Sequence, residues 1–399
     1  MFMYKNFQFK VKHQHNNARL CMIHTPHGVI NTPAFIFCAT KAAVKAVDIS
    51  KVKESNTQII LSNTYHLMLQ PGEDIIKKLG GLHKITGWDR PILTDSGGYQ
   101  IFSLGYGSVS QEIKSAGRPH KSKTLISINE EGAIFKSYIN GNIYHLTPEK
   151  SIQIQHKLGA DLVVVLDECT PFHISYDYTK NSMYMSNRWA IRCINEFKKI
   201  NDNSQALYGI IQGGIYEDLR RESCNFINNT PFFGHAIGGS LGNCKQQMYD
   251  IVSFTSEKLN RDRPIHLLGI GNINDIFQGV KSGIDTFDCV YPTRLARHGG
   301  ALIKVQYRNE ENATKEYINL RNERFKIDTN PIEADCKCFT CSHHSRGYIH
   351  HLLKAQEILA HSLLTIHNIY FMNNLMSAIR ESILNNTLDI EQKKWVVTS

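Results

Sequence analysis

Eight short apolar runs, each followed by a turn and a stretch that could be helical, predict an α/β fold of the (β/α)8 TIM barrel class. Continuous apolar runs are typical of parallel strands, which are buried on both faces. Eight strand and helix units over roughly 250 residues also match the usual size of such a barrel. In chain order, the runs are residues 34–37, 58–63, 91–98, 162–168, 207–214, 235–240, 265–271 and 284–290. A doubly wound open sheet is the alternative, because it is built from the same units.

Seven of these runs carry polar residues or glycines at their C-terminal ends. In chain order, these residues are Asn63, Asp95, Asp167, Gln212, Gly238 with Gly239, Gly269 and Asp288. One such residue carries little weight, because turns require polar residues and glycine. Seven together indicate a single site, since the C-terminal ends of barrel strands share the face on which active sites are built.

Two segments between the third and fourth runs differ from this pattern. Residues 105–125 are polar and rich in Gly, Ser and Lys, which predicts a mobile, basic loop. Residues 125–146 alternate apolar and polar side chains, which predicts a β-hairpin with Asn140 and Gly141 as its turn. Both segments precede the fourth run, so the loop connects the third and fourth strands of the predicted barrel.

The composition changes after Gly300, from a strand-like stretch through a cysteine cluster to two helical stretches at roughly 347–360 and 362–385. We therefore expect two parts. Residues 1–300 would form the catalytic barrel, and residues 301–399 an appended zinc-binding subdomain whose C-terminal helices pack on the barrel.

The ten cysteines indicate a metal site rather than disulfides. Only Cys336, Cys338 and Cys341 cluster, which in a reducing compartment favours a metal. A later histidine could be the fourth ligand, but the spacing does not choose among several. The candidates are His343, His344, His350, His351, His361 and His367. Three thiolates and one imidazole fill a tetrahedral zinc site and leave no position for substrate, so such a zinc would be structural.

The chain as a whole suggests a protein of the cytoplasm. Its first 28 residues lack the apolar core of a signal peptide, and no apolar stretch approaches the length of a membrane span. We therefore expect a cytoplasmic location and no membrane partner. The formal net charge of +9 at pH 7 suits a polyanionic partner such as RNA. Charge alone does not establish that partner, because many basic proteins bind no nucleic acid.

Carboxylates are the expected reactive groups, namely Asp95, Asp288, and Asp167 beside Glu168. Two carboxylates at one barrel mouth suit exchange at a glycosidic carbon, with one as nucleophile and one as acid or base. Attack would form a covalent sugar ester, and a second displacement would restore the original stereochemistry. The residues by themselves predict a barrel enzyme with a carboxylate site.

Eight motifs, taken in order along the chain, resemble those of one enzyme family. They are LSNTYHLMLQPG, ILTDSGGYQIFSL, LDECTP, GIIQGG, AIGGS, LLGIG, FDCVYPTR and C-x-C-x2-C with a later histidine. From about Thr25 to Ile383 the chain resembles the bacterial type of queuine tRNA-ribosyltransferase, also called tRNA-guanine transglycosylase. The resemblance implies exchange of guanine at wobble position 34 for a 7-deazaguanine. The substrates would be the transfer RNAs with a GUN anticodon, those for Asp, Asn, His and Tyr.

The resemblance also implies roles for individual residues. Asp288 would be the nucleophile, and Asp95 the general acid and base. The base and ribose would be bound by Asp95, Ser96, Tyr99, Asp167, Gln212, Gly238, Gly239, Leu268 and Asn63. Arg294 and Arg297 match arginines that read the nucleotide after the target. The ligands of one structural Zn²⁺ per subunit would be Cys336, Cys338, Cys341 and His367.

Some properties stay open at this point. Asn272 stands where the family resemblance leads us to expect a lysine, and the segment at 105–125 is longer than usual. Cys169 suggests 7-aminomethyl-7-deazaguanine as the incoming base, but the position of Leu241 or Gly242 keeps queuine as an alternative. The family's bacterial members imply a homodimer. An archaeal relative that acts at position 15 and a non-catalytic homologous subunit are the rival functions.

Overall fold

The computed structural model describes residues 4–106, 124–308 and 313–397, and in this part of the chain eight parallel strands close into a barrel. Around the barrel they follow the order β10-β11-β12-β13-β14-β4-β5-β6. The strands are β4 (Ala34–Cys38), β5 (Ile60–Ser62), β6 (Ile92–Thr94), β10 (Leu162–Val164), β11 (Ala206–Ile211), β12 (Gly234–Ile237), β13 (Ile265–Leu267) and β14 (Thr286–Cys289). Each predicted run overlaps one of them, so the predicted barrel is confirmed. The open sheet is wrong, because β6 pairs with β10 and β14 with β4 to close the ring.

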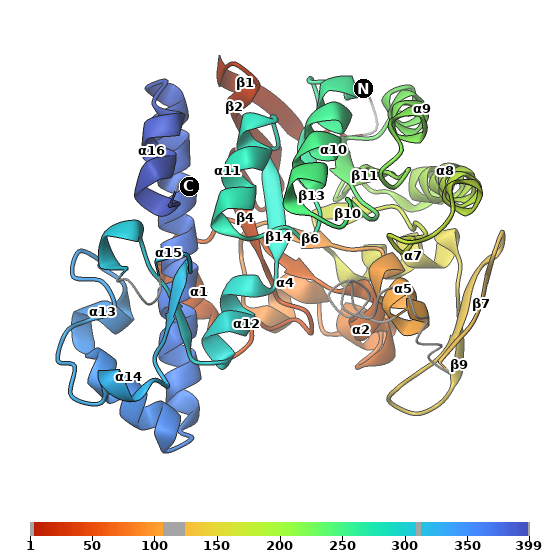
Figure 1. The fold of residues 1–399 in the computed structure, drawn as a ribbon. Helices are drawn as coiled ribbons and strands as arrows, with labels where there is room; N and C mark the ends of the chain where they lie inside the picture. The colour runs from red at the N-terminus through yellow and green to blue at the C-terminus, as the bar shows by residue number, and fades with distance from the viewer. Residues whose placement is uncertain (1–3, 107–123, 309–312, 398–399) are drawn as a thin grey trace.

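Helices surround the barrel strands (Figure 1). They are α1 (Ile49–Glu54), α2 (Thr64–Leu69), α3 (Glu73–Lys78), α4 (Gly81–Thr86), α5 (Gly98–Tyr106), α7 (Pro148–Leu158), α8 (Tyr176–Ile200), α9 (Glu217–Asn228), α10 (Lys245–Lys258), α11 (Ile273–Lys281) and α12 (Tyr291–Arg297). Capping residues in the sequence explain where several of these helices begin and end. Thr147 caps the N-terminus of α7 ahead of Pro148, and Gly159 ends it in a left-handed conformation. None of the helices in the described ranges has the length and apolar character needed to cross a membrane.

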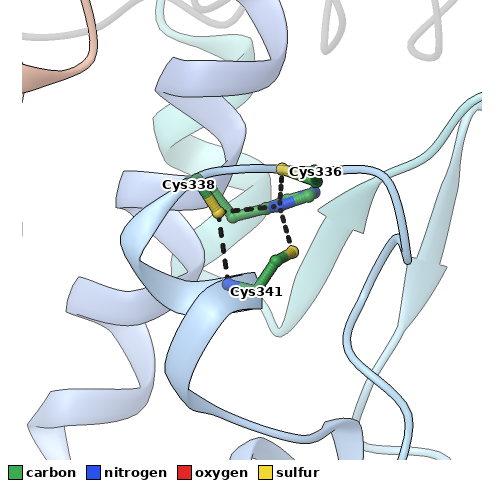
Figure 2. A group of neighbouring side chains, drawn as sticks. Cys336, Cys338 and Cys341 are labelled. Carbon is green, nitrogen blue, oxygen red and sulfur yellow. Dashed lines mark hydrogen bonds between the residues drawn. The ribbon is translucent and has the colours of Figure 1, made fainter.

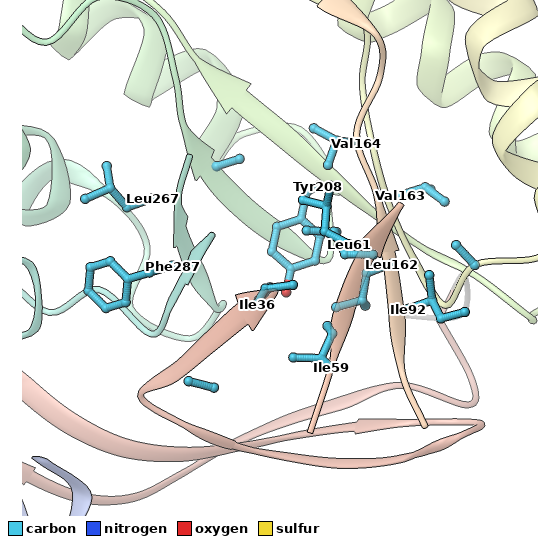
Figure 3. Packing of buried hydrophobic residues seen from close by; sticks show 14 of the residues in the cluster. Ile36, Ile59, Leu61, Ile92, Leu162, Val163, Val164, Tyr208, Leu267 and Phe287 are labelled. Atoms are coloured by element: carbon cyan, nitrogen blue, oxygen red, sulfur yellow. The ribbon is translucent and has the colours of Figure 1, made fainter. Parts of the chain in front are cut away.

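Apolar side chains from different barrel strands form one core cluster (Figure 3). It includes Ile36 of β4, Leu61 of β5, Leu162 of β10 and Tyr208 of β11, all of which are buried. Burial on both faces explains why these strands consist of continuous apolar residues. The polar residues that follow the strands are therefore presented at the barrel mouth.

An antiparallel sheet formed by β1 (Gln8–His15), β2 (Ala18–Thr25) and β3 (Gly28–Thr32) is attached at the other end of the barrel. Arg19 of β2 makes a buried, two-pronged contact with Asp285, which directly precedes β14. The Nε to Oδ1 distance is 2.9 Å, and the Nη2 to Oδ2 distance is 2.6 Å. This pair, which the sequence pattern did not reveal, joins the N-terminal sheet to the strand that carries Asp288.

The segment after the third barrel strand is a three-stranded meander rather than one hairpin. Its strands are β7 (Leu125–Asn129), β8 (Gly132–Lys136) and β9 (Ile143–Leu146). Asn140 and Gly141 do form part of a turn, the one between β8 and β9, where Gly141 has a φ of 74°. The prediction missed the tighter turn between β7 and β8. Of the predicted loop at 105–125, residues 107–123 lie outside the described ranges.

The C-terminal part contains β15 (Gly300–Leu302), η1 (Val305–Tyr307), β16 (Tyr317–Asn319), η3 (Glu323–Phe325), α13 (Phe339–His343), α14 (Arg346–Lys354), α15 (Ile358–Leu384) and α16 (Leu388–Trp395). The two predicted helical stretches correspond to α14 and α15, but the break comes earlier than predicted, at Gln356 with a φ of 60°. Helix α15 runs beside the barrel, with α13 and α14 next to it (Figure 1). Its Leu363 and Leu364 belong to a second apolar cluster, whereas Leu375 joins the main core.

Candidate active site and metal centre

The carboxylate of Asp288 lies at the C-terminal end of β14, and its two oxygens have different surroundings. The backbone N–H of Gly269 donates to Oδ1 over 2.9 Å. His266 Nε2 lies 3.2 Å from the same oxygen. The thiol of Cys38 on the neighbouring strand β4 contacts Oδ2 at 3.8 Å. Gly269 was a predicted mouth residue, but no sequence pattern indicated His266 or Cys38, which belong to buried strands.

Asp95 follows β6 and is held by the first residues of α2. Asn63 Nδ2 donates to Oδ2, and the backbone N–H of Thr64 donates to Oδ1 over 2.9 Å. Burial, joined by the charge of Asp288, raises the pKa of Asp95 to about 7 against the lowering effect of the Thr64 N–H. The two carboxylates are therefore close enough to influence each other, and Asp95 can take up or release a proton near neutral pH.

A second polar group joins three strands. Gln212 Nε2 donates to Asp167 Oδ2 over 2.6 Å, and Ser96 Oγ lies 3.4 Å from Asp167 Oδ1. All three residues are buried, and burial raises the pKa of Asp167 to about 6, opposed by hydrogen bonds from Gln212 and Ser96. A buried carboxylate and carboxamide with oriented hydrogen bonds can recognise donors and acceptors on a planar ligand.

Gly238 and Gly239 are needed here because their backbone packs closely against neighbouring side chains. A Cβ on Gly239, which has a φ of 77°, would lie 2.3 Å from Gln212 Oε1. A Cβ on Gly238 would lie 2.8 Å from Ile210 and 3.4 Å from Leu268. The Gly238–Gly239 backbone therefore lies directly beside Gln212, as a recognition surface made of main chain requires. Tyr99, in the first turn of α5, is 47% exposed.

Arg220 is a residue of this region that the sequence reading missed. Its guanidinium is fully buried and donates to the carbonyls of Gly214, Ile211, Gly238 and Ser240 over 2.8 to 3.3 Å. Burial lowers its pKa to about 10. Arg220 thus connects the loop after β11 with the loop after β12. On an amphipathic helix such as α9, an arginine gives no sequence signal that distinguishes it from a surface residue.

The two predicted RNA-reading arginines lie on α12, which directly follows Asp288. Arg294 is exposed and Arg297 partly buried. Partial burial and the charges of Arg297, Lys41 and Arg294 lower the pKa of Lys45, so these cations lie close together. Asn272, at the position where a lysine was expected, precedes the first residue of α11.

Cys336, Cys338, Cys341 and His367 gather at one point, as predicted. Figure 2 shows how the three cysteines face one another. The distances from His367 Nδ1 to the three sulfurs are 3.8, 3.6 and 3.4 Å. Tetrahedral zinc with ordinary bond lengths separates sulfur and nitrogen ligands by about 3.6 Å, so the side chains fit that ion. His367 Nε2 faces the carbonyl of Leu302 at 2.8 Å, which leaves Nδ1 for the metal.

The cluster of Cys336, Cys338, Cys341 and His367 is connected to the barrel mouth through Asn368, the residue after His367. Asn368 accepts a hydrogen bond from the Leu302 N–H over 2.9 Å. Its amide donates to the carbonyls of Pro292 in α12 and Gly300. Because α12 carries Arg294 and Arg297, the position of these arginines depends on α15 and on the cysteine cluster packed against it.

A second group of possible ligands, formed by His27, His83 and Asp161, does not fit one ion as it stands. The imidazole rings of His27 and His83 are stacked, with centroids 3.6 Å apart and an angle of 16° between their planes. Nitrogen lone pairs lie in the ring plane, so stacked rings cannot both direct one at a single metal. His27 Nδ1 instead lies 2.7 Å from Asp161 Oδ1, and His83 Nε2 lies 3.2 Å from Oδ2.

This group predicts a pH dependence of stability. The hydrogen bond to Asp161 raises the pKa of His27 above about 6.5. Burial raises the pKa of Asp161, but hydrogen bonds from His27 and His83 outweigh it and hold the pKa below its usual value. His27 therefore stabilises the fold below pH 6.5, and this contribution is lost as pH rises through the raised pKa. The Asp161 contribution is lost only as pH falls through its lowered pKa.

We expect His27→Asn to lower the melting temperature more at about pH 6 than at about pH 8.5. Thermal melts of the parent and of His27→Asn at the two pH values measure this difference in melting temperature. His145→Asn, at an exposed histidine of β9, is the matched control. Its melting temperature should differ from that of the parent by the same amount at both pH values. A His27→Asn effect that grows with pH would contradict the assignment.

Comparison with known proteins agrees with the resemblance in the motifs. Residues 14–398 match the family model described as queuine tRNA-ribosyltransferase. A protein of that name from Roseiflexus sp. (strain RS-1) is 43% identical over 401 residues, covering 98% of each chain. Another from Thermoanaerobacter sp. (strain X514) is 46% identical and covers 96% of this chain and 94% of its own. A third, from Protochlamydia amoebophila (strain UWE25), is 44% identical, with coverage of 94% and 95%.

Proposed function

Because the chain belongs to the queuine tRNA-ribosyltransferase family of tRNA-guanine transglycosylases, we propose that it exchanges guanine at wobble position 34 for a 7-deazaguanine. The proposed substrates are the transfer RNAs with a GUN anticodon, and the product belongs to queuosine modification. The observation that carries the chemistry is the placement of Asp95 and Asp288 at one barrel mouth, with the pKa of Asp95 raised to about 7.

In the first step, a carboxylate oxygen of Asp288 attacks C1′ of the ribose at position 34. A C–O bond forms while the C1′–N9 bond breaks, and its electron pair passes to N9 of the departing guanine. Protonated Asp95 delivers the proton that this base takes up. The result is a ribosyl ester of Asp288, a neutral guanine and an ionised Asp95.

In the second step, the incoming base loses its N9 proton to Asp95, and N9 attacks C1′. The ester bond breaks and Asp288 leaves as a carboxylate, so two inversions restore the starting stereochemistry. A pKa near 7 suits this double use of Asp95, because neither protonation state dominates at neutral pH.

The remaining predicted residues are proposed to hold the base and ribose. Asp167, Gln212 and the Gly239 backbone would meet the polar edge of the purine, supported by their short mutual distances. Tyr99 and Leu268 would cover its faces, since base stacking contributes about 1–3 kcal/mol per base. Ser96, Gly238 and Asn63 would support these contacts.

We propose one structural zinc held by Cys336, Cys338, Cys341 and His367, supported by ligand distances that suit a tetrahedral ion. It would crosslink the cysteine loop to α15 and supply no chemistry to the reaction. We also propose the division into a catalytic barrel, residues 1–300, and a zinc-binding subdomain, residues 301–399. The second apolar cluster, which includes Ile332 and Ile349, supports it.

Arg294 and Arg297 are proposed to read the nucleotide after the target. We expect Arg297→Ala to cost about 1–3 kcal/mol in kcat/KM and to relax discrimination at that nucleotide. The measurement compares anticodon stem-loops that differ only there, with Arg221→Ala, at an exposed arginine of α9, as the control. Equal weakening on all stem-loops would make Arg297 a phosphate contact instead.

For the incoming base we propose 7-aminomethyl-7-deazaguanine, with queuine as the alternative. Leu241, partly buried against the main core on the same loop as Gly239, supports a pocket without room for the larger base. The test supplies each base to one GUN transfer RNA preloaded with labelled guanine. Release of label with a queuine preference above about tenfold would reverse the choice of base. Absence of exchange at position 34 with either base would overturn the function, and exchange at position 15 would favour the archaeal activity.

We also propose a homodimer, as the family resemblance implies, and a cytoplasmic location. The exposed Phe339 and Tyr348, next to the cysteine cluster, support packing of two copies through this region. Sedimentation that reports a monomer at working concentration would contradict the dimer.

A further inference from the structure

We propose that His266 is a positioning residue for Asp288, and that it leaves Oδ2 as the oxygen that attacks the ribose. The proposal rests on the role of Asp288 in the proposed function. It goes beyond that function by naming the atom that reacts and the side chain that orients it.

The placement of His266 is the first observation. It lies in β13, next to β14, and its imidazole is almost fully buried. Among the described residues, Nε2 has no hydrogen-bond partner, yet it lies 3.2 Å from Asp288 Oδ1. A buried polar atom costs free energy unless it has a polar partner. For His266 Nε2, the nearby Asp288 Oδ1 is the atom that can offset this cost.

The other ring nitrogen decides which tautomer is present. Nδ1 lies 2.9 Å from the hydroxyl oxygen of Thr286, which can donate or accept. If Nδ1 carried the proton, Nε2 would direct a lone pair at a carboxylate oxygen, which is repulsive. When the Thr286 hydroxyl donates to Nδ1, Nε2 carries the proton and faces Oδ1 favourably. Thr286 therefore holds His266 in the form that can donate to Asp288.

Oδ1 then accepts a hydrogen bond from the Gly269 backbone N–H and has the Nε2–H of His266 at 3.2 Å, near enough to stabilise its charge although the contact lacks hydrogen-bond geometry. Oδ2 contacts only a thiol among the described residues, that of Cys38 at 3.8 Å, which is a weak donor. Its lone pairs are therefore the more available, and Oδ2 forms the bond to C1′. When the ester breaks in the second step, negative charge returns to the carboxylate, and the donors at Oδ1 stabilise it. Of the two displacements, the second is therefore the one that depends more strongly on His266.

The test compares two amide replacements of the same residue. Glutamine places its amide where Nε2 lies, whereas asparagine reaches only to Nδ1. We expect His266→Asn to slow breakdown of the covalent adduct by about 10- to 100-fold, the scale of one hydrogen bond to a charged group. His266→Gln should stay within about fivefold of the parent. Thr286→Val, which keeps the side-chain volume, should fall between the two.

The adduct is formed with a GUN transfer RNA, chased with the incoming base, and followed on a denaturing gel. Transfer RNA affinity and melting temperature are measured for each variant, and neither should differ between His266→Asn and His266→Gln. His235→Asn is the control, at a fully buried histidine of the adjacent strand β12. It should break down its adduct at the parent rate.

Equal breakdown rates for His266→Asn, His266→Gln and the parent would overturn the role of His266. If His266→Asn does not fold, parent-like breakdown in Thr286→Val would overturn it. A failure of the proposed function gives a different result, because the parent protein would then form no adduct with a GUN transfer RNA.

Discussion

Asp288→Asn is expected to bind transfer RNA with unchanged affinity and to form no covalent adduct. The side chain keeps its shape, and the Gly269 N–H can still donate to Oδ1, so the barrel mouth should be preserved. A carboxamide oxygen is a far weaker nucleophile than a carboxylate, so base exchange should fall on the order of 10⁴-fold or more. Denaturing gels measure the adduct, and release of labelled guanine measures exchange.

Asp95→Asn is the informative companion, because it removes the proposed proton carrier and leaves the proposed nucleophile in place. Its exchange should also fall, and the pH dependence that comes from a group with a pKa of about 7 should disappear. An adduct in Asp288→Asn would assign the nucleophile elsewhere. Normal exchange in Asp95→Asn would remove that residue from the proton transfer.

Cys338→Ser is expected to have the largest effect on folding. Cys338 is buried, caps α13 and lies 3.6 Å from His367 Nδ1, so serine removes one of the four ligands at the centre of the cluster. Structural zinc contributes about 10–16 kcal/mol of apparent binding free energy in small zinc domains, and most of it stabilises the fold. Metal content and folded yield should therefore fall together, as measured by elemental analysis and thermal melting.

Cys244→Ser is the matched control, because Cys244 is exposed and lies outside the cluster. It should retain both the metal and the melting temperature. A Cys338→Ser protein that lost its metal and still melted like the parent would show that the zinc does not stabilise this fold. The coupling through Asn368 to α12 also predicts weaker transfer RNA binding in Cys338→Ser.

The barrel was predictable because its signals are local. A strand buried on both faces is mostly apolar, as in β4 and β10, and such a run is visible in three to six residues. The errors arose where local patterns were ambiguous. The meander at 125–146 contains two turns, of which only Asn140–Gly141 has a recognisable turn sequence. Gln356 ends the helical stretch early by adopting a positive φ, which few residues signal in advance.

The candidate site divides in the same way. Asp95, Asp167, Gln212 and Asp288 end apolar runs, so their presence at one mouth follows from the barrel. His266, Cys38 and Arg220 also belong to the region, but they lie inside strands or on a helix face, where sequence periodicity assigns them to the core or the surface. Their importance comes from contacts with residues distant in the chain.

The sequence by itself determined the eight strands, the cysteine cluster and the family, since each depends on residue types at short, fixed spacings. Only the tertiary structure decided which oxygen of Asp288 is engaged and how far the pKa of Asp95 rises. The physical reason is that electrostatic and hydrogen-bonding energies depend on distance, direction and access of water. Strand register and barrel closure set those quantities between residues that the chain itself keeps far apart.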